Sequence, residues 1–181
     1  VQTCALPIWP ENLNLVFSAY EELTKRSATR RPDVVIWPEG ALPAVIDDLV
    51  AEGSPFAPRL RDALSPGQTL LMGANRAEPD GRGGYRYFNT LVAFRREAQA
   101  LRVVGYYDKF RLVPFGEFMP LGDLARTLGV RSLVHMEDDF TPGPRPRPLI
   151  VPGVPAVQPL ICYEALFPGL AADRKSTRLN S

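Results

Sequence analysis

Cysteine and histidine, which build many metal and catalytic sites, are scarce in this chain. Its 181 residues include two cysteines, Cys4 and Cys162, and a single histidine, His135. A disulfide framework uses more cysteines in a shorter chain, and a zinc site needs cysteine and histidine ligands at paired spacings. We therefore expect no disulfide framework, no metal site and no cofactor, which leaves either unreactive thiols or one catalytic thiol.

The chain also lacks long apolar runs and an excess of either charge. No apolar stretch approaches the roughly 18–20 residues that span a bilayer. The formal net charge of +1 gives no reason to expect a nucleic-acid partner, because such binding needs a concentrated basic surface. Hydrophobic residues make up 45% and charged residues 23%, as in an ordinary globular domain. We expect the chain as given to be soluble.

Both ends differ in character from the rest of the chain. The stretches "VQTCALPI" at the start and "DRKSTRLNS" at the end resemble translated adapter sequence, and such additions do not enter reasoning about the fold. We therefore expect residues 1–8 and 173–181 to be non-native, and residues 9–172 to form part of one domain. The alternative is that both ends are genuine flexible termini.

Helical and strand patterns alternate along the chain. Apolar residues at helical spacing predict helices, and short apolar runs bounded by proline and glycine predict strands. The predicted helices cover residues 11–27, 56–64 and 121–129, and the predicted strands lie within 32–40, 68–76, 87–95, 101–107 and 156–164. The β-branched run in 32–40 predicts a buried strand of a largely covered sheet. This order of elements predicts an α/β layered domain.

Three residues with complementary chemistry follow predicted strands. Glu39 comes after "VVIW", Lys109 after "VVGYY" and Cys162 after "VQPLI". The carboxyl ends of strands gather at one edge of an α/β sheet, so these side chains can meet although they lie far apart in the chain. A thiol attacks as the thiolate, and a carboxylate can take its proton. An ammonium can stabilise the oxyanion formed at a carbonyl or nitrile carbon.

Each of these residues also has an ordinary structural alternative. Cys162 can be a packed, unreactive thiol, Glu39 can cap a helix or lie in solvent, and Lys109 can be a surface lysine. Glu117 differs, because a charge in a loop as apolar as "VPFGE" needs a partner. His135 is expected to be a loop residue without a catalytic role. Spacing and composition alone leave the choice open.

Three motifs resemble the signature of the nitrilase, or carbon–nitrogen hydrolase, superfamily, whose catalytic set is Glu, Lys and Cys. They are "VVIWPEG", "YYDKFRLVPFGEFMP" and "LICYEALFP". In detail they are similar to the apolipoprotein N-acyltransferase family, which has Trp-Pro-Glu, Tyr-x-Lys followed by Leu-Val-Pro-Phe-Gly-Glu, and Ile-Cys-Tyr-Glu. The resemblance spans residues 9–170. It implies a nitrilase-like α-β-β-α sandwich that continues past residue 170.

The resemblance also implies a role for each matching residue. Cys162 would be the nucleophile that takes an acyl chain as a thioester, Glu39 would be the general base, and Lys109 would stabilise the oxyanion. Glu117 matches a second glutamate of the family's active site, which holds the lysine. Two further matches, Tyr163 and Glu164, lie beside the nucleophile as supporting residues. Trp9 matches a tryptophan of the family near this end, and the residues that bind substrate are left unassigned.

The same resemblance implies partners and a location. The acyl donor would be a phospholipid, and the acceptor would be the α-amino group of a diacylated lipoprotein's N-terminal cysteine. The complete protein would lie in a bacterial inner membrane, anchored by a segment before residue 9, with its catalytic domain on the periplasmic face. Against the family's pattern, we expect this sequence to lack that segment and the strands after the nucleophile. We therefore expect a C-terminally truncated sandwich that exposes a strand edge and is unstable or inactive by itself.

Two other functions fit the same residues. A soluble amidase or nitrilase would use the same triad on a small amide or nitrile, although the longer Leu-Val-Pro-Phe-Gly-Glu loop weighs against it. A catalytically inactive domain that binds a partner would keep the sheet without the chemistry, although the intact triad weighs against that. Phe115, Phe118 and Met119 are candidates to contact a lipid tail at the mouth of the site, with core packing as the alternative.

Overall fold

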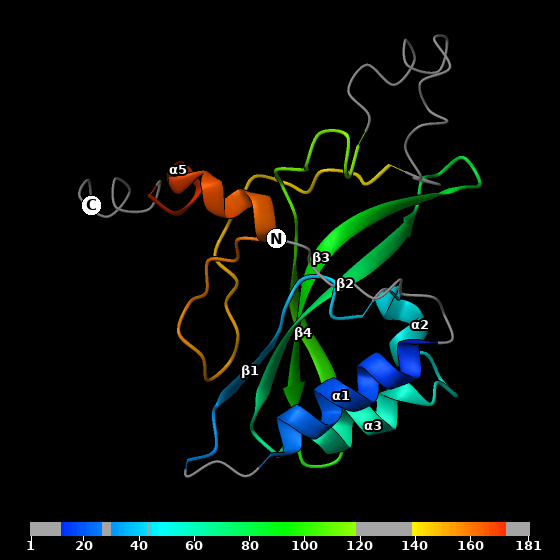
Figure 1. Cartoon of the computed structure of the whole chain (residues 1–181), viewed down its shortest axis with the longest axis vertical. Helices are drawn as coiled ribbons and strands as arrows, with labels where there is room; N and C mark the ends of the chain where they lie inside the picture. The colour runs from blue at the N-terminus through cyan, green and yellow to red at the C-terminus, as the bar shows by residue number, and fades with distance from the viewer. Residues whose placement is uncertain (1–11, 27–29, 43, 119–138, 173–181) are drawn as a thin grey trace.

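The computed structural model describes residues 12–26, 30–42, 44–118 and 139–172. These ranges contain helices α1 (Leu13–Lys25), α2 (Ile46–Val50), α3 (Phe56–Ala63) and α5 (Pro168–Ala172), the 3₁₀ helix η3 (Cys162–Leu166), and strands β1 (Val34–Trp37), β2 (Thr69–Pro79), β3 (Tyr85–Arg96) and β4 (Leu101–Asp108). Figure 1 shows α1, α2 and α3 grouped on one side of the sheet, with α5 apart from them. None of these helices is long and apolar enough to cross a bilayer.

The four strands form one sheet in the order β1-β2-β3-β4. β1 pairs with β2 in parallel, whereas the β2–β3 and β3–β4 pairs are antiparallel. β1, β2 and β4 therefore run in the same direction, and the carboxyl ends of β1 and β4 lie at the same end of the sheet. This topology places the residues that follow β1 and β4, Glu39 and Lys109, at one end.

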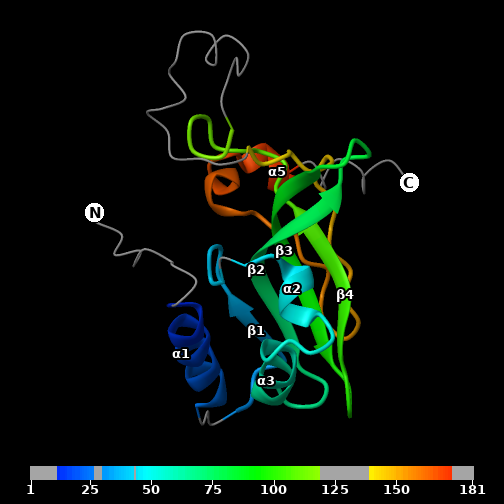
Figure 2. The same ribbon diagram turned by 90° about the vertical axis from the view of Figure 1, so that its right-hand side faces the viewer.

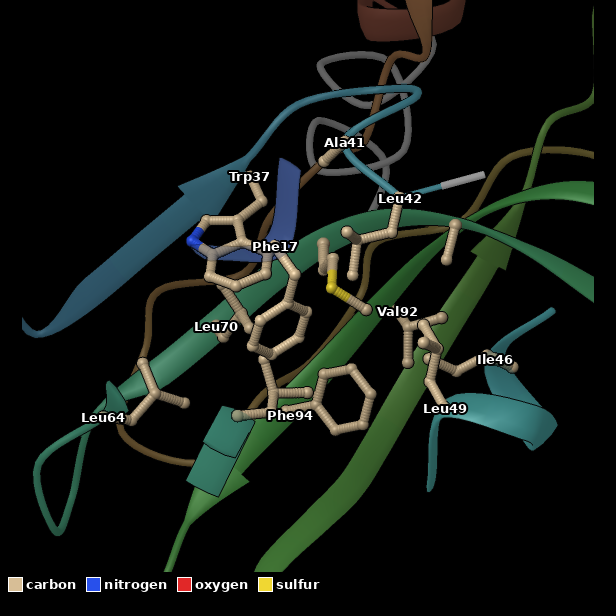
Figure 3. Packing of buried hydrophobic residues seen from close by; sticks show 13 residues of the cluster. Phe17, Trp37, Ala41, Leu42, Ile46, Leu49, Leu64, Leu70, Val92 and Phe94 are labelled. Atoms are coloured by element: carbon tan, nitrogen blue, oxygen red, sulfur yellow. The ribbon is translucent and has the colours of Figure 1, made fainter. Parts of the chain in front are cut away.

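Helices α1, α2 and α3 cover one face of the sheet, as Figure 2 shows from the side. Alternate strand residues point to this face, because side chains alternate along a strand. The buried residues on this face are Phe17, Trp37, Ala41, Leu42, Ile46, Leu49, Leu60, Leu64, Leu70, Met72, Ala74, Val92 and Phe94. In Figure 3, Phe17 of α1 lies beside Trp37 of β1, and their rings meet edge-to-face with centroids 5.7 Å apart. This core fixes β1, and with it the start of the loop that carries Glu39.

A second, smaller core covers the opposite face of the sheet. Leu71 of β2 and Ala93 of β3 pack here against Leu149 and Val151. Residues 149–157 fold back on themselves, because Leu149 and Val157 exchange two backbone hydrogen bonds of 2.8 and 3.0 Å. This packing anchors the segment that leads to Cys162, drawn in orange in Figure 1.

Most of the predicted elements are present. The helices predicted at 11–27 and 56–64 correspond to α1 and α3, and four of the predicted strands correspond to β1, β2, β3 and β4. α2 was not predicted, because its five residues are too few to display a helical period. The helix predicted at 121–129 lies outside the described residues.

The strand predicted within 156–164 is wrong. Val157 makes an isolated bridge there, and the chain enters η3 at Cys162. Two local features prevent a ladder. Pro159 has no N–H to donate, and the N–H of Ile161 donates instead to the Glu164 carboxylate at 2.9 Å.

The prediction of a largely covered sheet also fails at β1. β1 is an edge strand of the described sheet, and the Ile36 side chain is 66% exposed. The apolar run "VVIW" indicates a strand correctly, but a short apolar run cannot report whether both faces of that strand are covered.

Candidate active site

The loop after β1 brings Glu39 to the carboxyl end of the sheet. Pro38 stops the strand, and a turn follows in which the Ala41 N–H donates to the Pro38 carbonyl at 3.1 Å. Gly40 has a φ of +68°, which glycine adopts without steric cost. The loop lies directly on β2, since a Cβ on Gly73 would be 2.6 Å from the Pro38 oxygen and 2.7 Å from Glu39 Cα. Glycine at position 73 therefore permits the approach of Glu39.

Lys109 lies directly after β4 and is 1% exposed, so the surface-lysine alternative is wrong. Its backbone N–H donates to the backbone carbonyl of Asn89 at 2.8 Å. Its ammonium donates to Glu39 Oε1 at 3.2 Å and to Glu117 Oε1 at 3.0 Å. A buried charge is tolerated when it is paired in this way. Lys109 thus connects the loop after β1 with the loop after β4.

The loop after Lys109 folds Glu117 back onto the lysine. The N–H groups of Gly116 and Glu117 donate to the Val113 carbonyl at 3.2 and 2.9 Å. In return, Glu117 Oε2 accepts the Val113 N–H at 2.8 Å, and both carboxylate oxygens lie 3.0 Å from the Lys109 ammonium. The charge in this apolar loop therefore has the partner that its sequence context required.

Cys162 is exposed and is the first residue of η3. Its φ of +48° lies in the left-handed region, which residues other than glycine seldom adopt. Glu39 and Lys109 are close enough to the thiol to influence its protonation. The structure therefore brings together four of the predicted site residues: Glu39, Lys109, Glu117 and Cys162.

The shared charges set the protonation of the lysine and the thiol. Burial lowers the pKa of Lys109, but the hydrogen bonds and charges of Glu117 and Glu39 outweigh it and raise the pKa above its ordinary value. Burial raises the pKa of the Cys162 thiol, Glu39 raises it further, and Lys109 opposes them. At neutral pH the lysine is therefore an ammonium, and the thiol is protonated beside a carboxylate that can take its proton.

Glu164 joins the segment after β4 to the turn at Cys162. It is fully buried, and its carboxylate accepts four hydrogen bonds. The donors are the Tyr107 hydroxyl (2.8 Å) and the N–H groups of Phe110 (2.9 Å), Arg111 (3.1 Å) and Ile161 (2.9 Å). Tyr163 is the other residue that was predicted to support the nucleophile. Its ring packs edge-to-face on Phe167, with centroids 5.0 Å apart.

A hollow of about 550 Å³ lies between the segment after Lys109 and the segment after Cys162. Its lining is mainly apolar and includes Phe110, Leu166 and Phe167. The Arg111 guanidinium lies over the rings of Phe110 and Phe167, at 5.5 and 5.4 Å from their centroids. The hollow therefore combines apolar side chains with a cation held by aromatic rings.

Sequence reasoning missed Asn89, which lies among the charged groups. Asn89 is 9% exposed, and its Nδ2 donates to Glu39 Oε1 at 2.7 Å and to Glu117 Oε1 at 2.6 Å. A signal exists, because asparagine is depleted from strand interiors and "YFNTLVAF" places one inside an apolar run. Gly73, inside "TLLMGANR", is a second missed signal, because a strand glycine often marks the close approach of another backbone.

Several predicted residues lie away from this cluster or outside the described residues. Phe115 is 64% exposed and Phe118 is partly buried, so one of the two lipid-contact candidates that the structure describes is open to solvent. Cys4, Trp9, Met119 and His135 lie outside the described residues. Within the described ranges, no group of three His, Cys, Asp or Glu side chains is placed to hold a metal ion.

Comparison with known proteins identifies the family. A sequence profile of the carbon-nitrogen hydrolase family matches residues 1–178. An apolipoprotein N-acyltransferase of Caulobacter vibrioides is 46% identical over 170 residues, which cover 93% of this chain and 32% of the relative. A Brucella suis protein of the same name is 41% identical over 140 residues, covering 76% and 25%. The chain thus spans about a third or less of the length of these curated relatives.

A solved structure gives independent support for the fold. The glutamine-dependent NAD+ synthetase from Acinetobacter baumannii superposes with a TM-score of 0.51 at 15% identity, over 92% of this chain and 28% of that chain. At this identity the likeness concerns the fold alone, and it confirms the predicted nitrilase-like α/β class. Together with the family profile over residues 1–178, it leads to one conclusion: the chain belongs to the carbon–nitrogen hydrolase family.

Proposed function

We propose that this chain is part of the catalytic domain of an apolipoprotein N-acyltransferase, which moves an acyl chain from a phospholipid to the N-terminal cysteine amine of a diacylated lipoprotein. The proposal rests on the arrangement of Cys162, Glu39 and Lys109. This arrangement occurs in a chain that is 46% identical, over 93% of its length, to a relative of that name. The identity favours an acyltransferase over a soluble amidase or nitrilase.

In the first half-reaction, Glu39 takes the proton of the Cys162 thiol, and the sulfur attacks the carbonyl carbon of a phospholipid ester. A C–S bond forms, and the carbonyl oxygen becomes an oxyanion. The Lys109 ammonium, which Glu39 and Glu117 hold in place, stabilises that oxyanion by its positive charge. The C–O bond to glycerol then breaks. The leaving alkoxide takes the proton from Glu39, which gives a lysophospholipid and an acyl thioester.

In the second half-reaction, the α-amino nitrogen of the lipoprotein's N-terminal cysteine attacks the thioester carbonyl. A C–N bond forms, Glu39 takes a proton from the nitrogen, and the C–S bond breaks. The Cys162 sulfur leaves as a thiolate and regains the proton from Glu39. The thiol is restored and the product is an amide, so the cycle balances without an oxidant or a reductant.

We place the reaction at the periplasmic surface of a bacterial inner membrane, where the donor is part of the bilayer and the acceptor is anchored in it. The hollow beside η3 supports this location, because Phe110 and Phe167 offer apolar contact and Arg111 offers a cation for a phosphate group. Two exposed apolar side chains add to this surface. Leu166 (71% exposed) follows Cys162 in the chain, and Phe115 (64% exposed) precedes Glu117.

Trapping the thioester tests the proposal. The full-length protein, purified in detergent, is incubated with a phospholipid that carries a labelled acyl chain and no acceptor. We expect the label on the peptide that contains Cys162, released by neutral hydroxylamine, and transferred to the amine when a diacylated lipopeptide is added. Cys162→Ala should abolish labelling.

The alternatives give different results in the same assay. Release of ammonia from a small amide, with no acyl thioester from the phospholipid, would support a soluble amidase and contradict the proposal. A protein that neither labels nor hydrolyses, while remaining folded, would support an inactive domain that binds a partner.

A further inference from the structure

Asn89 lies among the charged side chains of Glu39, Lys109 and Glu117, although no motif of the sequence singled it out. It belongs to β3 (Tyr85–Arg96), and its carbonyl accepts the Lys109 N–H at 2.8 Å. The backbone of β3 therefore ties Asn89 directly to the residue that carries the ammonium. Its neighbour Thr90 points to the opposite face, where the hydroxyl donates to Asp108 at 2.6 Å. Position 89 is thus the point where β3 faces the site.

The amide of Asn89 bridges the two glutamates. Nδ2 carries two N–H groups, and they donate to Glu39 Oε1 at 2.7 Å and to Glu117 Oε1 at 2.6 Å. Ionised carboxylates only accept hydrogen bonds, so the nitrogen side of the amide has to face them. The same two oxygens accept the Lys109 ammonium at 3.2 and 3.0 Å. Glu39 is therefore held through one oxygen, by one cation and one neutral donor, whereas Glu117 is held through both of its oxygens.

This double bridge determines which oxygen of Glu39 can act as the base. A carboxylate oxygen has two lone pairs, and those of Glu39 Oε1 are occupied by Asn89 and Lys109. Oε2 is therefore the oxygen left to accept a proton from the Cys162 thiol, whose protonation this carboxylate influences. Because an amide does not titrate, Asn89 fixes the orientation without adding a charge to the cluster.

We infer that Asn89 is a positioning residue of the site, which together with Lys109 occupies Oε1 of Glu39 and so presents Oε2 to the Cys162 thiol. The inference rests on the proposed function for the identity of the reaction, but its geometry does not depend on which acyl donor is used. The ionisable groups that face Asn89 are Glu39, Glu117 and Lys109, and Glu39 in turn influences the thiol.

The decisive variant is Asn89→Asp, which keeps the size of the side chain, removes both donors and adds a third carboxyl group beside one ammonium. In the full-length protein we expect kcat/KM for acyl transfer to fall on the order of 100-fold, because a misplaced catalytic group costs about that much. The loss should lie in kcat, with KM for the phospholipid nearly unchanged. In the pH profile of kcat/KM, the acid limb, where activity is lost as the pH falls, should move to higher pH. Three carboxyl groups around one cation retain a proton more readily.

Thr90→Val is the matched structural control, because it removes a buried donor from the adjacent residue on the other face of β3. It should lower the unfolding temperature without moving the acid limb. If Asn89→Asp does not fold, Asn89→Ser carries the test, because a single hydroxyl hydrogen can serve only one of the two carboxylates. A loss in kcat/KM with an unmoved acid limb, as in a merely destabilised protein, would overturn the inference.

A second readout separates this inference from the proposed function. The alkylation rate of Cys162 by iodoacetamide, followed on its peptide by mass spectrometry, needs no acyl substrate. We expect its midpoint to shift to higher pH in Asn89→Asp and to stay in place in Thr90→Val. A shifted midpoint in a protein that transfers no acyl chain would support the role of Asn89 and reject the acyltransferase. An unshifted midpoint in a folded Asn89→Asp would reject the role of Asn89.

Discussion

The Tyr107 hydroxyl donates to the buried Glu164 carboxylate at 2.8 Å. Tyr107 belongs to β4, two residues before Lys109, and Glu164 lies two residues after Cys162. Their hydrogen bond therefore joins the strand that carries the ammonium to the turn that carries the thiol. Burial raises the pKa of Tyr107 and the Glu164 carboxylate raises it further, so the phenol remains a donor throughout the range in which proteins are stable.

The first prediction concerns this hydrogen bond. Tyr107→Phe leaves Glu164 with three donors and should lower the free energy of unfolding by about 1–3 kcal/mol, the usual cost of depriving a buried charged group of a partner. Urea unfolding followed by the fluorescence of Trp37, which is 2% exposed, measures the change. Tyr106→Phe is the matched control, because Tyr106 is 53% exposed. It should change stability by no more than about 0.5 kcal/mol, and equal losses in the two variants would contradict the prediction.

The second prediction concerns the ion pair on the opposite face of the sheet. The Arg76 guanidinium donates two hydrogen bonds of 3.1 and 2.7 Å to the Asp108 carboxylate. Asp108 directly precedes Lys109. Arg76→Lys keeps the charge but cannot form the bidentate pair of hydrogen bonds. We therefore expect the unfolding free energy to fall by about 1–3 kcal/mol. Arg86→Lys is the control, because that side chain is 51% exposed and its ion pair contributes little. The prediction fails if Arg86→Lys costs as much.

The meeting of Glu39 and Lys109 could be predicted from the sequence because it depends on strand direction. Each residue follows an apolar run of strand character, and the ends of such strands gather at one edge. β1 and β4 do run in the same direction. The prediction therefore needed the positions of the strands, which the pattern of apolar residues supplies, and a shared direction for β1 and β4, which the structure shows.

The route by which Cys162 reaches this edge was not predictable in the same way. Its segment resembles a strand in composition, yet it is held by the packing of Leu149 and Val151 and by the Glu164 carboxylate. A side chain that replaces a sheet partner leaves no periodic signal. Asn89 was missed for a related reason, since its role depends on two carboxylates that lie 50 and 28 residues away in the chain.

The third prediction concerns the close approach of the Glu39 loop to β2. Gly73→Ala places a Cβ less than 3 Å from backbone atoms of Pro38 and Glu39, so the loop has to move. We expect acyl transfer to fall about 100-fold, because a displaced catalytic group loses its alignment, and unfolding free energy to fall by about 1–3 kcal/mol. Gly169→Ala, where nothing lies within 4 Å of the added carbon, should leave the unfolding free energy nearly unchanged. Full activity in Gly73→Ala would show that the contact does not position Glu39.

The Cys162 thiol reports the charges around it. Burial and Glu39 raise its pKa above the ordinary 9.0, and Lys109 opposes them. The folded state therefore binds the thiol proton more tightly than the unfolded state. The resulting contribution to stability is complete below pH 9.0. It is lost as the pH rises through the pKa that the Cys162 thiol has in the folded protein. Because the thiolate is the reactive form, the pH dependence of alkylation measures the shift.

The last prediction is that two substitutions move this titration in opposite directions. Cys4→Ser leaves Cys162 as the one thiol of this chain, and its alkylation by iodoacetamide should have a midpoint above pH 9.0, which falls to the ordinary value when the chain is unfolded in urea. Adding Glu39→Gln removes the negative charge and should lower the midpoint, whereas adding Lys109→Met removes the opposing cation and should raise it. Circular dichroism verifies that each variant is folded. A midpoint that Glu39→Gln leaves in place would mean that the carboxylate does not act on the thiol, and Glu39 could then not be its base.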